Sequence, residues 1–283
     1  MSNKEIKRLG IDVSDNQGYI NWEEVKAAGV QFVIMRSTRG SGNPDKQLAS
    51  NIAGCKRVGI PFDFYKYRYG TTESKTRAEA QKVIATLVSL GVKPSKDTII
   101  WEDVEDKTLK ALSKAELTRL SKVFREEVEA AGFGYGLYMG MYDYGVEIKA
   151  EEIQDDCWIA RYYKGYEAML FGTMPNEQKC PTVKEGCKLW GWQFSSSGQV
   201  PGIKGNVDLD ICYYDIKETE VAPEYYETPE FTLIDSLNKI GVDSSYTFRK
   251  KIAAVNGIQN YKGTAEQNVE MLRLLNVGEL KEV

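Results

Sequence analysis

The sequence of 283 residues contains no histidine, and this absence excludes several common kinds of active site. Ser-His-Asp and Cys-His catalytic groups, histidine general bases and His-Glu-x-x-His zinc sites all require the missing residue. Any hydrolytic chemistry must therefore depend on carboxylates, lysine, tyrosine or cysteine. We expect neither a metal ion nor an organic cofactor.

Cysteine is scarce, and its spacing excludes further classes of site. No Cys-x-x-Cys pair is present, so the templates for redox and structural zinc sites do not fit. Cys180 and Cys187 flank a short loop and could form a bridge, but we expect free thiols in a protein made in the cytoplasm. The odd and scattered set is Cys55, Cys157, Cys180, Cys187 and Cys212.

The chain also lacks an apolar run of the roughly 18 residues that are needed to cross a bilayer, so we expect no membrane partner. Its first ten residues carry charges but no apolar core of the kind found in signal peptides, which predicts synthesis in the cytoplasm. The net charge of −4 argues against general binding to nucleic acid.

Strand and helix patterns alternate through the first half of the chain. Apolar runs of strand length are separated by helical patterns that end at glycine. Repeats of this length are typical of right-handed crossovers and a parallel sheet. The expected strands are 8–14, 31–37, 60–67, 98–105 and 135–141, and the expected helices are 21–29, 45–59, 73–90 and 113–131.

The pattern changes in the second half of the barrel sequence. Residues 156–163, 188–195 and 205–213 are predicted as strands, with no clear helix between them. Eight strands with four good helices favour a closed barrel over an open doubly wound sheet. The predicted fold is therefore α/β: a modified TIM-like barrel of five β/α units, followed by strands without regular helices.

The stretch Thr98–Asp106 (T-I-I-W-E-D-V-E-D) is the strongest candidate for chemistry, because an apolar strand ends in four acids. Side chains alternate along a strand, so Asp103 and Glu105 are expected on the same side. Two neighbouring carboxylates repel when both are ionised, which raises the pKa of one of them and can keep it protonated as an acid. A solvated acidic loop is the alternative interpretation of an isolated Asp-x-Glu.

Other strand ends strengthen the interpretation as a site. In such barrels, active sites lie at the C-terminal ends of the strands. Several expected strands would direct acidic, basic or aromatic side chains into one mouth, where aromatic faces suit sugar rings. Each aromatic residue taken alone is explained equally well as core. The candidates are Asp12, Arg36, Tyr65, Tyr67, Asp103, Glu105, Tyr138, Tyr162, Trp192, Gln193 and Asp208.

Seven segments together resemble the glycoside hydrolase family 25 lysozymes, and the resemblance covers about residues 8–215. They are L-G-I-D-V-S-D-N-Q-G (9–18), F-V-I-M-R-S (32–37), P-F-D-F-Y-K-Y (61–67), D-V-E (103–105), C-W-I-A-R-Y (157–162), W-Q-F-S-S-S-G-Q-V-P-G-I (192–203) and G-N-V-D-L-D (205–210). Two positions depart from the family pattern. Lys66 stands where the family usually has histidine, and Thr38-Arg39-Gly40 lacks the usual acidic residue.

The resemblance implies a muramidase that hydrolyses the β-1,4 bond between N-acetylmuramic acid and N-acetylglucosamine in bacterial peptidoglycan. It assigns Glu105 as the acid that protonates the leaving oxygen. Asp103 would stabilise the positive charge at the anomeric carbon or orient the acetamido group of the substrate. Asp12 and Asp208 would shape the charge and hydrogen bonding around this pair. The resemblance suggests retention of configuration, which the sequence alone does not decide.

The C-terminal segment differs from the barrel sequence. Residues 216–230 hold five glutamates and two prolines without a periodic pattern, and are predicted to be a linker. Residues 231–283 are predicted to form a small helical domain, with helices at 233–240, 245–256 and 264–276. Its expected core residues are Leu233, Ile234, Leu237, Ile240, Phe248, Ile252, Leu272 and Leu275.

The stretch 249–268 resembles C-terminal modules on wall hydrolases of Gram-positive bacteria and their phages. By this resemblance, residues 231–283 would be a cell-wall-binding domain, and an anionic wall polymer could be a partner. The basic candidates for that contact are Arg249, Lys250, Lys251 and Lys262. The alternative is a helical appendage for folding or self-association, since about fifty residues are marginal for independent stability.

The sequence thus predicts a phage-type endolysin. Residues 1–215 would form a muramidase barrel that waits in the host-cell cytoplasm until it is released to the wall. One alternative is a chitinase-like glycosidase, although Ile99-Ile100-Trp101 does not supply the further aspartates that such enzymes carry upstream. The other alternative is a non-catalytic wall-binding protein, against which the presence of all four acids argues.

Overall fold

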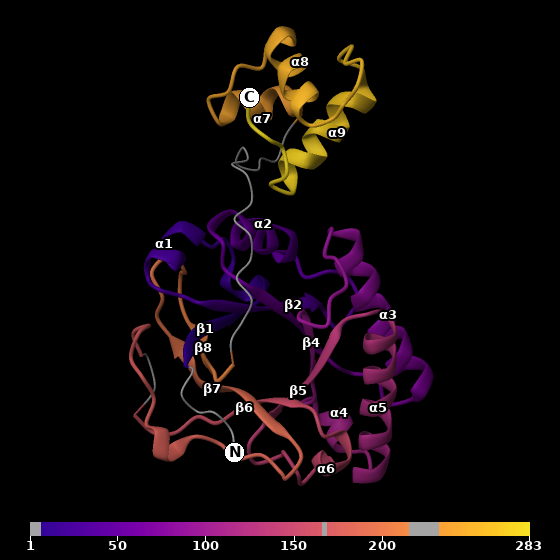
Figure 1. Ribbon diagram of the computed structural model, residues 1–283, viewed down its shortest axis with the longest axis vertical. Coiled ribbons are helices and arrows are strands. Elements are labelled where there is room, and N and C mark those ends of the chain that lie inside the picture. Colours follow the sequence, from indigo (N-terminus) through magenta and orange to yellow (C-terminus); the bar gives the residue numbers. More distant parts are fainter. Residues whose placement is uncertain (1–6, 166–168, 215–231) are drawn as a thin grey trace. The chain divides into compact units, whose positions relative to one another are not determined.

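The computed structural model describes residues 7–165, 169–214 and 232–283 (Figure 1). The chain divides into two compact units: one holds all eight strands, and the other holds the C-terminal helices together with residues Ala49–Gly59. The predicted linker at 216–230 lies entirely outside the described residues. No helix of the described ranges combines the length and apolarity needed to cross a membrane.

The eight strands form a closed barrel in the order of the sequence, which confirms the predicted fold class. They are β1 (Arg8–Val13), β2 (Phe32–Thr38), β3 (Phe62–Tyr67), β4 (Ile99–Asp103), β5 (Gly134–Gly140), β6 (Asp156–Ala160), β7 (Lys188–Gly198) and β8 (Val207–Cys212). Neighbouring strands from β1 to β7 are parallel, whereas β8 is antiparallel to both β7 and β1. Consequently β8 begins at the end of the barrel where the other seven strands finish.

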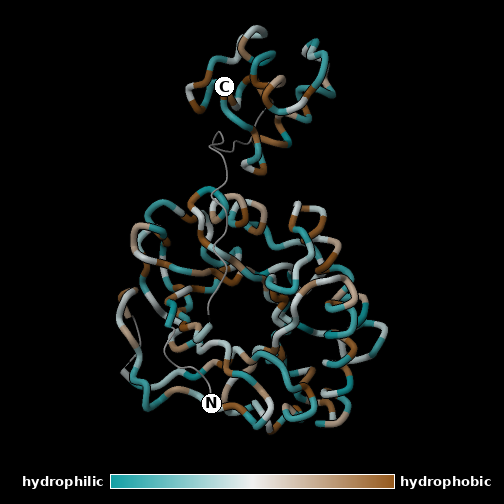
Figure 2. Tube along the Cα trace, in the orientation of Figure 1, coloured by the Kyte–Doolittle hydropathy of each residue, from teal (hydrophilic) through white to brown (hydrophobic). Residues whose placement is uncertain are grey.

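Helices connect the parallel strands of the first half. They are α1 (Trp22–Ala27), α2 (Leu48–Val58), α3 (Glu73–Ser89), α4 (Lys107–Lys110), α5 (Lys114–Ala130) and α6 (Ala150–Ile153), and two 3-10 turns occupy Asp15–Gln17 and Glu177–Lys179. Asn21, Thr72 and Ser113 accept backbone hydrogen bonds as N-caps of α1, α3 and α5, which explains where these helices begin. Figure 2 shows hydrophilic and hydrophobic residues alternating along the helices around the barrel, as amphipathic helices require.

The barrel interior is packed with aromatic rings rather than hollow. Trp101 and Trp158 are fully buried, with ring centroids 5.9 Å apart. Gly136 on β5 faces Trp101 so closely that an added Cβ would lie 2.3 Å from the indole ring. Glycine at this position therefore leaves the space that the tryptophan occupies.

A buried ion pair lies behind β4. Arg68 and Glu102 are both fully buried, and their Nη1 and Oε1 atoms are 3.0 Å apart. The second oxygen of Glu102 accepts a 2.6 Å hydrogen bond from the Tyr135 hydroxyl, and Ser121 of α5 donates to the first. Because each carboxylate oxygen has partners, the desolvation cost of this buried charge is partly offset.

Residues 232–283, called the C-terminal unit below, contain three helices: α7 (Leu233–Lys239), α8 (Tyr246–Val255) and α9 (Ala265–Asn276). Thr264 and Gln267 form a capping box at the start of α9, the helix predicted at 264–276. The expected residues Leu233, Leu237, Ile252 and Leu275 are buried together, joined by residues that were not expected, including Tyr261, Met271 and Leu280. Ile234 was predicted as core but is 42% exposed, because it lies on the outer face of α7.

Some predicted boundaries were wrong, and one of them concerns the candidate site. β4 ends at Asp103, so Glu105 follows the strand instead of continuing it. Helix α2 begins at Leu48 and not at Asp45, whose carboxylate contacts Arg36. The short helices α4 and α6 had no clear signal in the sequence.

Candidate active site

Four carboxylates predicted from the sequence lie at one end of the barrel. Asp12 of β1 and Asp208 of β8 are direct register partners. Asp103 ends β4 and is paired with Tyr67 of β3 on one side and Tyr138 of β5 on the other. Glu105 follows two residues later and is half-buried.

The four acids are close enough to act on one another electrostatically. Burial is the largest cause that raises the pKa of Asp103 and of Asp208. The charge of Glu105 is the second cause for both. The charge of Asp208 likewise adds to burial in raising the pKa of Asp12. The structure therefore brings the predicted acids from β1, β4 and β8 into one electrostatic cluster.

Burial, more than the neighbouring acid, controls the pKa of Glu105. Burial raises this pKa, Lys110 opposes the increase, and Asp143 adds to it. Lys110 and Asp143 themselves form an ion pair with 2.6 Å between Nζ and Oδ2. The sequence predicted a raised pKa for Glu105 but attributed it to Asp103, and it gave no sign of the Lys110–Asp143 pair.

Asp103 is the more deeply buried member of the Asp-x-Glu pair, at 4% exposure. Burial raises its pKa well above the ordinary value, Glu105 adds to this, and Lys66 opposes it. Its Oδ1 atom is buried and has no hydrogen-bond partner among the described residues. Two adjacent carboxyls with raised pKa values can hold one proton between them, which is the requirement for an acid next to an anion.

Gln193 of β7 connects the tyrosines of the site to Asp12. Its Nε2 donates a 2.6 Å hydrogen bond to Asp12 Oδ2. Its Oε1 accepts hydrogen bonds from the hydroxyls of Tyr138, at 2.7 Å, and Tyr162. Two hydroxyl donors on the oxygen fix the orientation of the amide, so that its nitrogen faces the carboxylate.

Asp210 is a further acid in this cluster and was not among the predicted site residues. It is fully buried on β8, and its Oδ1 accepts a 2.8 Å hydrogen bond from the indole nitrogen of Trp158. Burial is the main cause that raises its pKa, and Asp208 adds to it. The signal was available, because residues i and i+2 of a strand share a face and Asp208 was already selected.

The other predicted side chains are distributed differently around this end of the barrel. Tyr65 lies near charges of both signs. Burial is the largest cause that raises its pKa, Asp12 adds to this increase, and Arg36 opposes it. Arg36 forms ion pairs with Asp15 and, at 2.7 Å, with Asp45. The Tyr67 hydroxyl lies 3.4 Å from Asp106, and Tyr162 is 46% exposed.

Trp192 lies on the opposite face of β7 from Gln193. It pairs with Ile159 and Ile211, whereas Gln193 pairs with Ala160 and Asp210. The indole is fully buried, donates a 3.0 Å hydrogen bond to the Arg161 carbonyl and stacks on Tyr163. The structure therefore places Trp192 away from the carboxylates.

Within the described ranges, no three side chains among the cysteines and acids are arranged to hold a metal ion. All five cysteines are free thiols. Cys180, one of the two that could have formed a bridge, has its sulfur 3.1 Å from the Tyr213 hydroxyl.

Comparison with known proteins agrees with this geometry. Lysozyme M1 of Streptomyces globisporus is 26% identical over 215 residues, which cover 70% of this chain and 65% of that protein. The crystal structure of the bacterial lysozyme from Streptomyces coelicolor has the same fold, with a TM-score of 0.57 and 23% identity over 73% of this chain and 92% of that one. The L-alanyl-D-glutamate peptidase of Listeria phage A118 is 45% identical over 51 residues, 18% of each chain.

The chain spans less than two thirds of the length of the curated lysozymes that it matches. The family model described as "Glycosyl hydrolases family 25" matches residues 11–203, which include three of the four predicted acids and Gln193. Since this match extends over most of the barrel and more than half of the sequence, the chain belongs to glycosyl hydrolase family 25.

Proposed function

We propose that this chain is a muramidase of the endolysin type, which hydrolyses the β-1,4 bond between N-acetylmuramic acid and N-acetylglucosamine in bacterial peptidoglycan. The observation that carries the proposal is the cluster of Asp12, Asp103, Glu105 and Asp208 at one end of a family 25 barrel. Glycosidic cleavage needs a proton for the leaving oxygen and a negative group beside an oxocarbenium-like centre. Neighbouring carboxyls with raised pKa values supply both.

In this mechanism Glu105 protonates the leaving oxygen, because it is the more accessible member of the pair. The proton that the two carboxyls held between them has then left, so Asp103 is an anion. This anion faces the anomeric carbon, or it orients the acetamido group of the substrate. The Asp103 Oδ1 atom has no hydrogen-bond partner in the described part of the chain, and it can accept a hydrogen bond from that group. Asp12 and Asp208 set the field around the pair, and Gln193 holds Asp12 in place.

We further propose that the C-terminal unit binds the cell wall. What supports this is that 51 residues, about the length of this unit, are shared with a phage enzyme whose printed activity is that of a peptidase. Lys250, Lys251 and Lys262 are exposed. Arg249 is not: it donates to the Tyr261 hydroxyl and to Asn268 inside the unit, so the exposed lysines are the candidates for contact with anionic polymer.

Product analysis tests the reaction. Purified Gram-positive walls should lose turbidity when the full chain is added, and new reducing ends should appear on N-acetylmuramic acid. Release of products from chitin and not from peptidoglycan would instead support a chitinase-like glycosidase. Wall binding without any new reducing ends would support a non-catalytic binding protein.

Wall binding is tested separately, by co-sedimentation with walls. The Lys251→Glu/Lys262→Glu variant should bind walls more weakly than the Lys93→Glu/Lys188→Glu variant, which makes the same charge change at exposed lysines of the barrel. Equal binding of the two variants would contradict the role of the C-terminal lysines. The endolysin proposal also includes location in the host cell before release, and self-association of the chain.

A further inference from the structure

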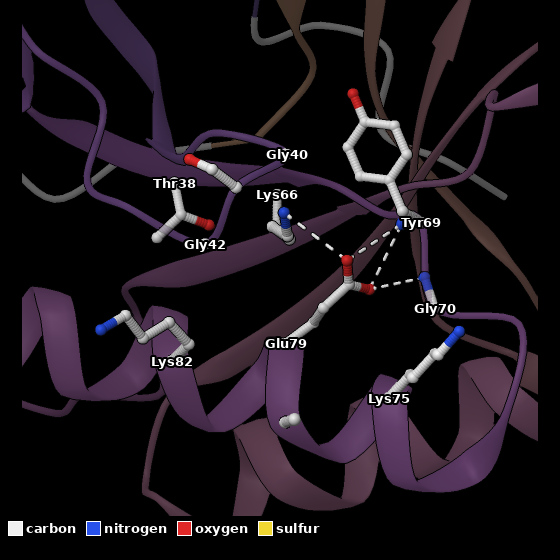
Figure 3. A pocket seen from close by; sticks show the side chains of 11 residues that line it. Thr38, Gly40, Gly42, Lys66, Tyr69, Gly70, Lys75, Glu79 and Lys82 are labelled. Atoms are coloured by element: carbon white, nitrogen blue, oxygen red, sulfur yellow. Dashed lines mark hydrogen bonds and ion pairs between the residues drawn. The ribbon is translucent and has the colours of Figure 1, made fainter.

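A pocket of about 490 Å³ lies between the segment that follows β2 and helix α3 (Figure 3). This volume is in the range of roughly 300–1,000 Å³ that is typical of small-ligand sites. Its walls include Thr38 at the end of β2, Lys66 on β3 and Tyr69 beyond β3. None of these residues belongs to the carboxylate cluster described above.

Positive charge dominates the side of the pocket that α3 forms. Lys75, Glu79 and Lys82 follow one another at helical spacing, so they share one face of the helix, and Figure 3 shows them beneath the pocket. Neither lysine makes an ion pair within the described ranges of the chain, and both are exposed. With Lys66, the pocket holds three ammonium groups against one carboxylate.

That single carboxylate is already engaged by the backbone. Glu79 accepts hydrogen bonds from the backbone nitrogens of Tyr69, at 3.1 Å, and Gly70, at 2.9 Å. Its oxygen lies 3.8 Å from Lys66 Nζ, which is a loose ion pair. Figure 3 marks this pair with a dashed line. Glu79 therefore fixes the loop after β3 and leaves much of the lysine charge uncompensated.

Two buried polar groups of the pocket also lack adequate partners. The side chain of Lys66 is 1% exposed. Besides Glu79, the partners of its ammonium among the described residues are the Arg39 carbonyl, at 3.4 Å, and the Tyr69 ring, whose centroid is 5.5 Å away. The Thr38 hydroxyl is buried and has no hydrogen-bond partner among the described residues. Buried donors of this kind are normally satisfied, so they indicate a site for an acceptor.

The pocket adjoins the catalytic end of the barrel. Lys66 is near enough to Asp103 to oppose the increase in its pKa. The Tyr69 ring, on the pocket wall, lies 5.0 Å from the ring of Tyr67, which is the register partner of Asp103. A ligand here would therefore be a neighbour of a glycan strand bound at the carboxylates.

We propose that this pocket binds an oxyanion, a carboxylate or a phosphate, that is attached to the wall glycan being cleaved. This inference rests on the proposed muramidase function and adds a second recognition site to it. Lys66 and Thr38 donate to the anion at the base of the pocket, Lys75 and Lys82 provide charge at its entrance, and the Tyr69 ring packs against the carbon chain that bears the anion. Carboxylates of wall peptides and phosphates of wall polymers share this chemistry.

The test compares the Lys75→Glu/Lys82→Glu variant with the matched Lys93→Glu/Lys188→Glu variant, both in the full chain. Each is assayed on complete walls, on walls stripped of phosphate polymer, and on glycan freed of both peptides and polymer. On complete walls the pocket variant should show a KM raised by roughly five- to tenfold with kcat nearly unchanged, as expected for loss of ground-state binding. The control variant should resemble the wild type.

The substrates identify the source of the anion. If stripping the phosphate polymer abolishes the difference in KM, the ligand is phosphate; if the difference persists there and disappears on peptide-free glycan, it is a carboxylate. The proposal would be overturned if the pocket variant differed from the wild type in KM equally on bare glycan. It would also be overturned if KM did not differ on any substrate.

A binding experiment separates this inference from the muramidase proposal. Inorganic phosphate added to the wild type should shift the amide resonances of Gly40, Gly42 and Gly70, which line the pocket, and the shifts should be lost in the pocket variant. These shifts would support the pocket even if no substrate released reducing ends. Their absence in the wild type would count against the pocket whether or not walls are hydrolysed.

Discussion

Asp12 and Asp208 face each other across two antiparallel strands, β1 and β8, although they come from opposite ends of the barrel sequence. Burial and the charge of Glu105 raise the pKa of Asp208 to about 6, and burial together with Asp208 and Asp210 raises the pKa of Asp12. Closing the barrel therefore concentrates negative charge where water is partly excluded. A site of this kind favours the protonated form of its acids.

Replacing Glu105 should remove most of the activity. In the Glu105→Gln variant, kcat on peptidoglycan should fall by about 100- to 10,000-fold, the usual contribution of a general acid. The measurement is the rate of release of reducing ends. Glu151→Gln, at an exposed glutamate of α6, is the control and should keep its full rate. A Glu105→Gln variant that kept more than a tenth of the wild-type kcat would show that another group delivers the proton.

The Asp208→Asn variant should change how stability depends on pH. The folded pKa of about 6 lies above the ordinary aspartate value of 3.8, so the folded state binds the proton more tightly than the unfolded state. The stabilisation from this proton is complete below pH ~4 and is lost as pH rises through about 6. At pH 8 the variant should therefore be the more stable protein, by at most about 3 kcal/mol.

Denaturant unfolding of both proteins from pH 4 to pH 8 measures this difference. The advantage of the variant should appear between pH 4 and pH 7 and then level off. A constant difference across the whole range would show that ionisation of Asp208 is not its cause.

Gln193 should stabilise the barrel through its hydrogen bond to Asp12. In Gln193→Leu, the buried Asp12 carboxyl and the Tyr138 hydroxyl both lose a partner, which should cost about 1–3 kcal/mol of unfolding free energy. The bond to Gln193 lowers the pKa of Asp12, so this pKa should rise further in the variant. Thermal unfolding and the pH profile of kcat are the readouts. Gln81→Leu, which removes an exposed amide on α3, should leave both unchanged.

Removing one member of the buried pair Arg68–Glu102 should destabilise the barrel more than removing the charges of both. Arg68→Met leaves Glu102 as an unpaired buried charge and should destabilise the barrel by about 3–5 kcal/mol. Adding Glu102→Gln should recover part of this loss, because the amide still accepts from Tyr135 and no longer carries a charge. A double-mutant cycle by denaturant unfolding measures the coupling. If the losses of unfolding free energy in the two single variants simply add, the two groups do not interact. The control is Arg119→Met, which removes a member of an exposed pair with Glu116 and should have almost no effect on stability.

Local sequence was sufficient for much of the fold. The N-caps Asn21 and Thr264 begin the helices predicted at 21–29 and 264–276, because capping depends on residues within one helical turn. The Asp-x-Glu motif was located correctly at the end of β4. The origin of its pKa values was not, because burial by the surrounding barrel, which no local pattern expresses, is the largest cause for both Asp103 and Glu105.

The sequence by itself determined that strands of this chain end in acids and that eight of them could close into a barrel. Only the tertiary structure decided that β8 runs antiparallel to its neighbours, which brings the beginning of this strand, with Asp208, to the catalytic end. The register of β7 is a second such decision: an irregularity around Trp190 turns Gln193 toward Asp12 and Trp192 away from it. Side chains alternate along a strand, so a shift of one residue moves a group to the opposite face, and that shift is set by the neighbouring strands.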